Sequence, residues 1–347
     1  MTKVDLMRLR VELTPPEPYF LGGERIFEIG DGNKHYFIRS LQTPPQTTLF
    51  GILRYLGISN PSPDMSFDAD NIGKNSFHLL NATCDTPAFG KIQGISPLYL
   101  ADSSDFYYIP TPFDHKVGEE NRDGLEYEPF TDYIEDFLKT KKYPRDYTAK
   151  YGVADSWTCI APGPNYKKTY KNLFGRDVRT RIDKINTKKA FVKKEHVYLK
   201  KGFSFVFFAS VADDFNFVTE RFVQPGFLAK VEKAGAEPMI PGDLLQPGMI
   251  YAQSDIYLSS EEANRLYSMC SFTCVQTKEF RGRTTNPEAK TVGERFKRYE
   301  QTATLIQSGS VFIPAEGQKE NAVEILTGNA HARIAGFNHI VTGGTAL

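Results

Sequence analysis

The segment 39–54, RSLQTPPQTTLFGILR, combines residue types that can bind phosphate. Its two adjacent prolines enforce an extended entry, and we expect Thr47 or Thr48 to cap the apolar helix that follows. Free N–H groups and hydroxyls at a helix N-terminus bind anions without a dedicated lysine. A capped helix alone would also explain these residues. The candidate phosphate contacts, with arginine countercharge, are Arg39, Gln46, Thr47, Thr48 and Arg54.

The stretch 178–199, VRTRIDKINTKKAFVKKEHVYL, is strongly basic. Arg179 and Arg181 alternate with apolar or neutral residues, so a strand would point both toward one face, where arginines pair well with phosphates. Lys188 and the lysines after it are predicted to lie in a polar connection, for which a solvated surface is the simpler explanation. The stretch therefore predicts phosphate contacts from the two arginines, with Lys188 as a further candidate.

Basic and aromatic residues interleave in two neighbouring segments, FRGR at 280–283 and ERFKRY at 294–299. Binding of single-stranded RNA often uses this combination, because aromatic rings stack on bases and cations contact the backbone. A hairpin with solvated charges explains the pattern equally well. Arg281 and Arg283 are the candidate contacts.

The C-terminal segment 333–347, RIAGFNHIVTGGTAL, is rich in glycine. Its glycines would let the backbone turn sharply and approach a ligand closely, where a side chain would intervene. A frayed end is the alternative, although the apolar residues of the segment are numerous enough to dock. The candidate binding residues here are Gly336, Phe337, Asn338, His339, Gly343 and Gly344.

Sequence motifs of enzymes and metal sites are missing. The chain has no Walker A, GxSxG or GxGxxG motif, and its six histidines share no metal-binding spacing. The CSFTC pair at 270–274 lacks a partner motif, so two packed strand cysteines are expected there instead of a zinc site. We therefore predict neither a metal nor another cofactor. RNA cleavage without a metal would need a general base, for which His35 and His339 are the candidates.

Charge is balanced overall but segregated along the chain. Lys plus Arg and Asp plus Glu number 42 each, which argues against a protein that binds nucleic acid on its own. Segment 102–136 is acidic and segment 167–201 is basic, so we expect the first to face a protein partner and the second to face RNA. With no signal peptide and no apolar run of about 20 residues, we expect a cytoplasmic protein without a membrane partner.

Apolar patterning predicts an α+β fold with many strands and long inserted loops. Strands are expected at 7–13, where apolar and charged residues alternate, and at 202–212, a continuous apolar run. A further strand is expected at 333–342, and a helix within 256–268 that is capped by serine at 259–260. No short-period repeat is present.

Four segments, in their order along the chain, resemble one RAMP-superfamily family, subunit three of the type III-B CRISPR effector (the Cmr complex). The first is FLGGERIFEIG…FIRSLQTPPQTTLFGILRYLG, in which the family has a Pro-Pro-x-Thr-Thr-x-x-Gly-x-x-Arg helix start. The others are VRTRIDKINTKKA…VYLKKGFSFVFFA, YEQTATLIQSGSVFIPAEG and AGFNHIVTGG, the last being similar to the glycine-rich loop of the family. Together these segments span most of the chain.

The resemblance implies two ferredoxin-like (RRM-like) RAMP modules, 1–165 with an insertion at about 60–150, and 166–347. It also implies a non-catalytic subunit that holds the 5′ repeat-derived tag of CRISPR RNA in antiviral defence. The implied protein partners are the large polymerase/cyclase subunit and the adjacent backbone RAMP subunit. A RAMP-type endoribonuclease that processes precursor CRISPR RNA with a histidine base is the alternative.

Overall fold

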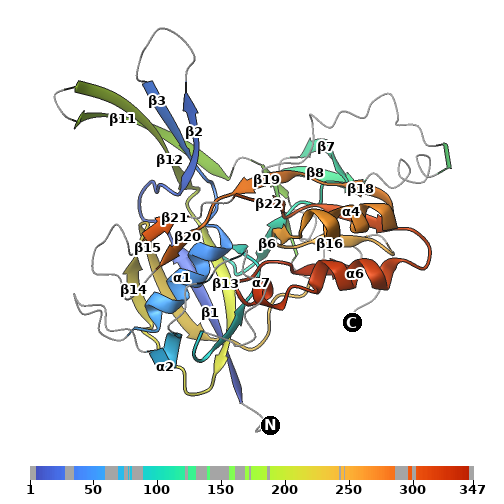
Figure 1. The fold of residues 1–347 in the computed structure, drawn as a ribbon. Coiled ribbons are helices and arrows are strands. Elements are labelled where there is room, and N and C mark those ends of the chain that lie inside the picture. Colours follow the sequence, from blue (N-terminus) through green and yellow to red (C-terminus); the bar gives the residue numbers. More distant parts are fainter. Residues whose placement is uncertain are drawn as a thin grey trace.

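The protein has a mixed α+β fold built mostly from antiparallel sheets (Figure 1). The computed structural model describes residues 5–27, 35–58, 69–73, 77, 79, 89–121, 124–129, 139–140, 156–160, 169–171, 173–185, 188–241, 244–245, 247–285, 296–298 and 302–343. The largest described sheet has eleven strands. In spatial order these are β14 (Glu220–Val223), β15 (Phe227–Lys233), β1 (Leu6–Thr14), β13 (Phe203–Ala212), β5 (Tyr99–Asp102), β6 (Tyr107–Pro110), β9 (Ser156–Cys159), β10 (Thr169–Lys171), β8 (Gly124–Pro129) and β7 (His115–Asn121), with β4 (Ile92–Ile95) also paired to β13.

Strands β1 and β13 are neighbours in this sheet and confirm the strands predicted at 7–13 and 202–212. In β1 the apolar residues Leu9, Val11 and Leu13 are fully buried on one face, because successive side chains of a strand alternate between faces. Strand β13 is buried along most of its length, as its continuous apolar sequence predicts. The main core therefore lies on one face of this pair of strands.

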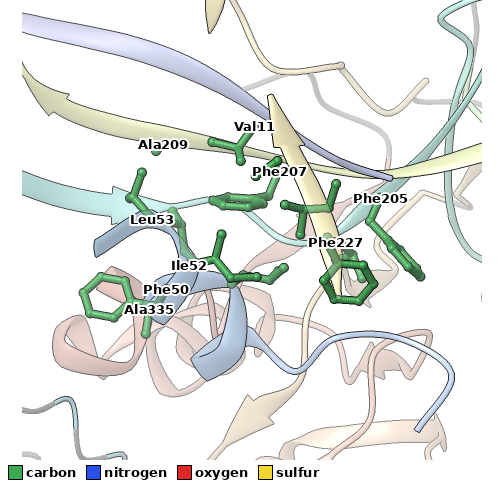
Figure 2. Close-up of a cluster of buried hydrophobic side chains, with 14 of the residues drawn as sticks. Val11, Phe50, Ile52, Leu53, Phe205, Phe207, Ala209, Phe227 and Ala335 are labelled. Carbon is green, nitrogen blue, oxygen red and sulfur yellow. The ribbon is translucent and has the colours of Figure 1, made fainter. Parts of the chain in front are cut away.

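Helix α1 (Gln46–Leu56) covers that buried face. Its apolar residues recur at helical spacing, so Leu49, Ile52, Leu53 and Leu56 all point into the core. Figure 2 shows side chains of α1 in one cluster with side chains of β1, β13 and β15. The predicted helix after the paired prolines is thus confirmed, and Gly57 caps its C-terminus as expected.

A second sheet projects from the body as an arm (Figure 1). Its strands, in spatial order, are β11 (Phe174–Ile185), β12 (Lys188–Leu199), β3 (His35–Ser40) and β2 (Gly22–Phe27). The predicted polar connection containing Lys188 is wrong, because these lysines form strand β12. The two long strands pair in unbroken register from Phe174↔Leu199 to Ile185↔Lys188, which leaves only residues 186–187 between them. Backbone pairing overrides the polar composition there.

The chain after β15 forms separate, smaller sheets and most of the described helices. The sheets are β18 (Cys270–Cys274), β23 (Val311–Pro314), β16 (Ile250–Ala252) and β24 (Ile340–Thr342); β17 (Ile256–Tyr257), β22 (Ala303–Ile306) and β19 (Thr277–Phe280); and β20 (Arg283–Thr285) with β21 (Phe296–Arg298). The helices are α4 (Ser260–Met269), α6 (Lys319–Thr327) and α7 (Ala330–Ile334), with the short α2 (Ala69–Ile72) earlier in the chain.

Two local predictions in this C-terminal part have different outcomes. The serine cap of α4 is confirmed, since Ser259 and Glu262 form a reciprocal capping box. The predicted strand at 333–342 is wrong for its first half. Asn329 caps α7 by accepting a hydrogen bond from Ala332, and positive φ angles at Gly336 and Asn338 turn the chain before β24.

The sheet hydrogen bonds do not follow a division of the chain at residue 165. Strand β1, at the start of the chain, lies between β13 and β15 and pairs with both. Described strands from both sides of residue 165 therefore share one sheet, whereas the described strands after Lys233 belong to other sheets. Non-local pairing of this kind has no signature in a local sequence pattern.

Candidate nucleic-acid interface

The N-terminus of α1 lies where the predicted phosphate site requires a helix start. The predicted threonine cap is wrong: Pro45 occupies the cap position in an extended conformation without a side-chain cap, so Thr47 and Thr48 lie inside the first turn. The carbonyl of Pro45 accepts hydrogen bonds from the N–H groups of Thr48 (2.8 Å) and Leu49 (3.1 Å). The N–H groups of Gln46 and Thr47 precede these bonds and point out of the helix end.

Gly336 lies against this helix start, although the two are 290 positions apart in sequence. A Cβ atom on Gly336 would lie 2.6 Å from Oε1 of Gln46 and 2.8 Å from the carbonyl oxygen of Ser96, and its φ of +86° favours glycine. The predicted close approach thus exists, but it is made to the protein's own chain. Figure 2 shows the neighbouring Ala335 in the same cluster as Phe50 of α1.

Phe337, a predicted ligand contact, is a core residue in the structure. Its side chain is fully buried, and its ring stacks on Phe77 with centroids 6.2 Å apart. It also meets Phe280 edge to face at 6.1 Å. The FRGR segment is thereby held beside the C-terminal loop, with Arg281 exposed after it. Arg283 lies on β20, and its side chain is outside the described residues.

Asn338 uses its side chain to hold the C-terminal loop in place. Its backbone is left-handed (φ 57°) and its side chain is fully buried. The amide nitrogen donates to the carbonyls of Tyr257 (3.0 Å) and Leu326 (2.9 Å), and Oδ1 accepts from the N–H of Tyr257 (2.9 Å). A direct contact between this amide and RNA would have to compete with these internal bonds.

The C-terminal segment is docked as far as Gly343, the last residue that the structure describes. Strand β24 pairs with β16, and the N–H of Gly343 donates to the carbonyl of Met249 at 2.8 Å. The N–H of His339 donates to Oγ of Ser254 at 3.0 Å. Gly344 lies outside the described residues. The loop thus has a fixed backbone conformation.

Burial gives His339 an unusual titration. Removal of its imidazole from water lowers its pKa from 6.5 to about 4, and Nε2 lies 3.4 Å from the carbonyl oxygen of Arg333. The ring is therefore neutral near pH 7, and it is a weak base. The other candidate base, His35, lies on β3, and its side chain is outside the described residues.

This titration predicts acid sensitivity. Between pH 6.5 and 4 the unfolded chain binds the His339 proton and the folded chain does not, so the free energy of unfolding falls as the pH falls. We expect a loss on the order of 2 kcal/mol between pH 7.5 and 4.5. Urea unfolding at both pH values should show this difference shrinking in His339→Gln. An equal loss of unfolding free energy between the two pH values in the wild type and in His339→Gln would contradict this prediction.

Arg54 is placed differently from the prediction. It lies in the last turn of α1, away from the helix start, and its guanidinium donates to the carbonyls of Ile72 (3.1 Å) and Gly73 (2.9 Å). It also lies 5.9 Å from the ring centroid of Phe89. Burial lowers its pKa to about 10. Its charge therefore links α1 to α2 instead of adding countercharge at the start of α1.

The arm carries the predicted basic stretch and several exposed cations. Strands β11 and β12 hold eight Lys and Arg against three Asp and Glu. Arg39 is exposed beside Phe37, with 5.6 Å between guanidinium and ring centroid, and Arg179 is exposed and paired with Asp177 at 2.8 Å. Lys193 is also exposed. Arg181 and Lys188 lie on the same two strands, but their side chains are outside the described residues.

The sequence reasoning missed the aromatic residues at the base of the arm. Lys194 lies 5.2 Å from the ring centroid of Phe20, and His196 lies 5.5 Å from the same ring. Tyr198 follows on the same strand and is 45% exposed. The alternation KEHVY within the basic run is the signal that could have identified this face.

Two further findings concern the part of the chain that the structure describes. It contains no group of three His, Cys, Asp or Glu placed to hold a metal ion. Separately, none of its helices has both the length and the apolarity that crossing a membrane requires.

No family model matches the chain, and no curated protein matches it either. The fold, however, is shared with a chain of a solved structure. A chain of the type III-B Cmr-beta complex bound to cognate target RNA aligns over 96% of both chains with 16% identity and a TM-score of 0.52. A chain of Cmr-beta bound to cognate target RNA and AMPPnP aligns over 96% of both with 15% identity and a TM-score of 0.48. A chain of the Csm3–Csm4 subcomplex of the type III-A complex covers 90% of this chain and 95% of its own, with 12% identity and a TM-score of 0.35.

Proposed function

We propose that this protein is a subunit of a type III CRISPR effector complex and binds CRISPR RNA. The observation that carries the proposal is the fold likeness to a chain of the Cmr-beta complex, which extends over 96% of both chains. The order of the four resembling segments agrees with it. The basic arm supplies a surface on which an RNA backbone can be neutralised.

Within such a complex the role of subunit three of the type III-B effector fits best. The protein would then be a cytoplasmic, non-catalytic subunit that anchors the 5′ tag of CRISPR RNA. It would contact the large polymerase/cyclase subunit and the adjacent backbone RAMP subunit. Two ferredoxin-like RAMP modules belong to this proposal, with a boundary after β15 in better agreement with the sheet pairing than one at residue 165.

The charge distribution supports an assembly member more than a free-standing RNA binder. The chain has zero formal net charge, so long-range attraction to RNA is weak. The projecting arm concentrates positive charge locally, and its exposed Arg39, Arg179 and Lys193 can contact phosphates there. RNA contacts on the arm leave the rest of the surface for protein partners.

The test is to incubate the purified full-length chain with single-stranded RNA of the host's CRISPR repeat. Binding is followed by fluorescence anisotropy, and cleavage by denaturing gel. We expect binding that weakens steeply with salt and leaves the RNA intact. Specific cleavage that is lost in His339→Gln or His35→Gln would support the endoribonuclease instead. No binding at low salt, by the chain or by its native complex, would overturn the proposal.

A further inference from the structure

The outer end of the Tyr198 side chain lies over Gly175 at the base of the arm. The two residues stand opposite each other in the β11–β12 register. A Cβ atom on Gly175 would be 1.9 Å from Cζ of the tyrosine and 2.2 Å from its hydroxyl oxygen, so only glycine leaves room for the ring. The outer end of the ring therefore lies against Gly175, yet 45% of the residue stays exposed. The open part of the ring faces solvent.

The face of β12 that bears Tyr198 points away from the body. Residues of the opposite parity, Glu195, Val197 and Leu199, are buried, with 7%, 1% and 9% exposure. Because side chains alternate along a strand, Tyr198, His196 and Lys194 share the outer face. The outer face is therefore a row of two rings and a cation.

Further charged and aromatic groups flank this row. Arg179 stands directly opposite Lys194 in the register, which places both cations on the outer face. Phe20 packs beside His196 and Lys194, along the edge of β12 that is opposite β11. Backbone hydrogen bonds between Tyr19 and Val197 fix Phe20 next to this strand. Rings and cations in one row match the alternating bases and phosphates of a single-stranded nucleic acid.

We propose that Tyr198 is a stacking platform for an unpaired base of the bound RNA, with Lys194 and Arg179 holding the adjoining phosphates. The inference rests on the proposed function and deepens it by naming a site that reads unpaired RNA. A ring already placed against Gly175 loses less conformational freedom when a base stacks on it than a ring that extends freely into solvent. Stacking is tolerant of sequence, because every base offers an aromatic face.

The experiment measures the affinity of repeat-derived, fluorescein-labelled single-stranded RNA for four variants across a KCl series. Tyr198→Ala should weaken binding about tenfold or more, with an unchanged salt slope, since no charge is lost. Gly175→Ala should cause a similar loss by displacing the ring while keeping the tyrosine. Tyr198→Phe should bind like the wild type. Phe222→Ala is the matched control, because Phe222 is an exposed aromatic (58%) on β14, away from the arm.

The outcomes separate this inference from the proposed function. If the wild type binds RNA, and Tyr198→Ala and Gly175→Ala both bind it as tightly as the wild type does, the stacking site is wrong and the proposed function stands. A reduced salt slope in Tyr198→Ala would also overturn stacking at Tyr198. So would a loss of RNA affinity in Phe222→Ala as large as the loss in Tyr198→Ala. If the wild type binds no RNA, the proposed function fails and the stacking site fails with it.

Discussion

Replacing Asn338 with Ala is expected to lower the free energy of unfolding by about 3–4 kcal/mol. The substitution removes three hydrogen bonds and leaves the N–H and carbonyl of Tyr257 and the carbonyl of Leu326 without this partner. Each buried polar group that loses its partner costs about 1–3 kcal/mol. Alanine is also strained at the φ of 57° that this position adopts.

Urea unfolding followed by circular dichroism measures this loss. Asn338→Gly separates its two causes, since glycine accepts the positive φ but restores none of the bonds. Asn321→Ala is the matched control, because that asparagine is exposed on α6 and its amide nitrogen donates to the side chain of Gln318 on the same surface; we expect a change below about 0.5 kcal/mol. Unchanged stability in Asn338→Ala, combined with weaker RNA binding, would instead support the predicted direct RNA contact.

Removing three positive charges from the arm should weaken RNA binding by about 10- to 100-fold near physiological salt. The variant combines Arg179→Gln, Lys193→Gln and Lys194→Gln. All three residues lie on the arm; Arg179 and Lys193 are exposed, and Arg179 and Lys194 share its outer face. Each lost phosphate contact should also reduce the salt slope by about 0.7, so three contacts reduce it by about two. Glutamine keeps most of the side-chain length, which limits effects on folding.

The control for this variant removes the same charge elsewhere. Lys230→Gln, Lys233→Gln and Arg265→Gln are all exposed, on β15 and α4, and lie outside the arm. Anisotropy titrations at several salt concentrations compare the two triple variants. Equal losses in both would mean that the overall charge of the protein matters and the arm has no special role.

Local sequence patterns were sufficient to predict those elements in which the spacing of apolar residues matches one secondary structure. The alternation in β1, the continuous apolar run of β13 and the helical spacing of α1 each match a single environment. The capping box of α4 is equally local, because its two partners are three positions apart. Strands β1 and β13 and helix α1 enclose the main core, whereas α4 packs against a separate cluster.

The candidate site was harder to predict, because its residues act through distant partners. Gly336 makes the close backbone approach that a glycine predicts, and the group it approaches in the structure is the side chain of Gln46. Asn338 is a polar residue in a glycine-rich segment, a combination that is typical of a binding loop. In the structure its side chain instead bonds to the backbone of Tyr257 and Leu326. Tyr198 escaped notice because its glycine partner lies on another strand. A single sequence does not encode such pairs in any local spacing.

The most direct test of RNA binding on the arm is photocrosslinking of the full-length chain to repeat-derived RNA that contains 4-thiouridine. Mass spectrometry then identifies the crosslinked peptides. We predict crosslinks to the base of the arm, at Phe20, His196 or Tyr198, and competition by unlabelled RNA. Crosslinks confined to other parts of the chain, such as the outer edge around Phe222, would contradict the account.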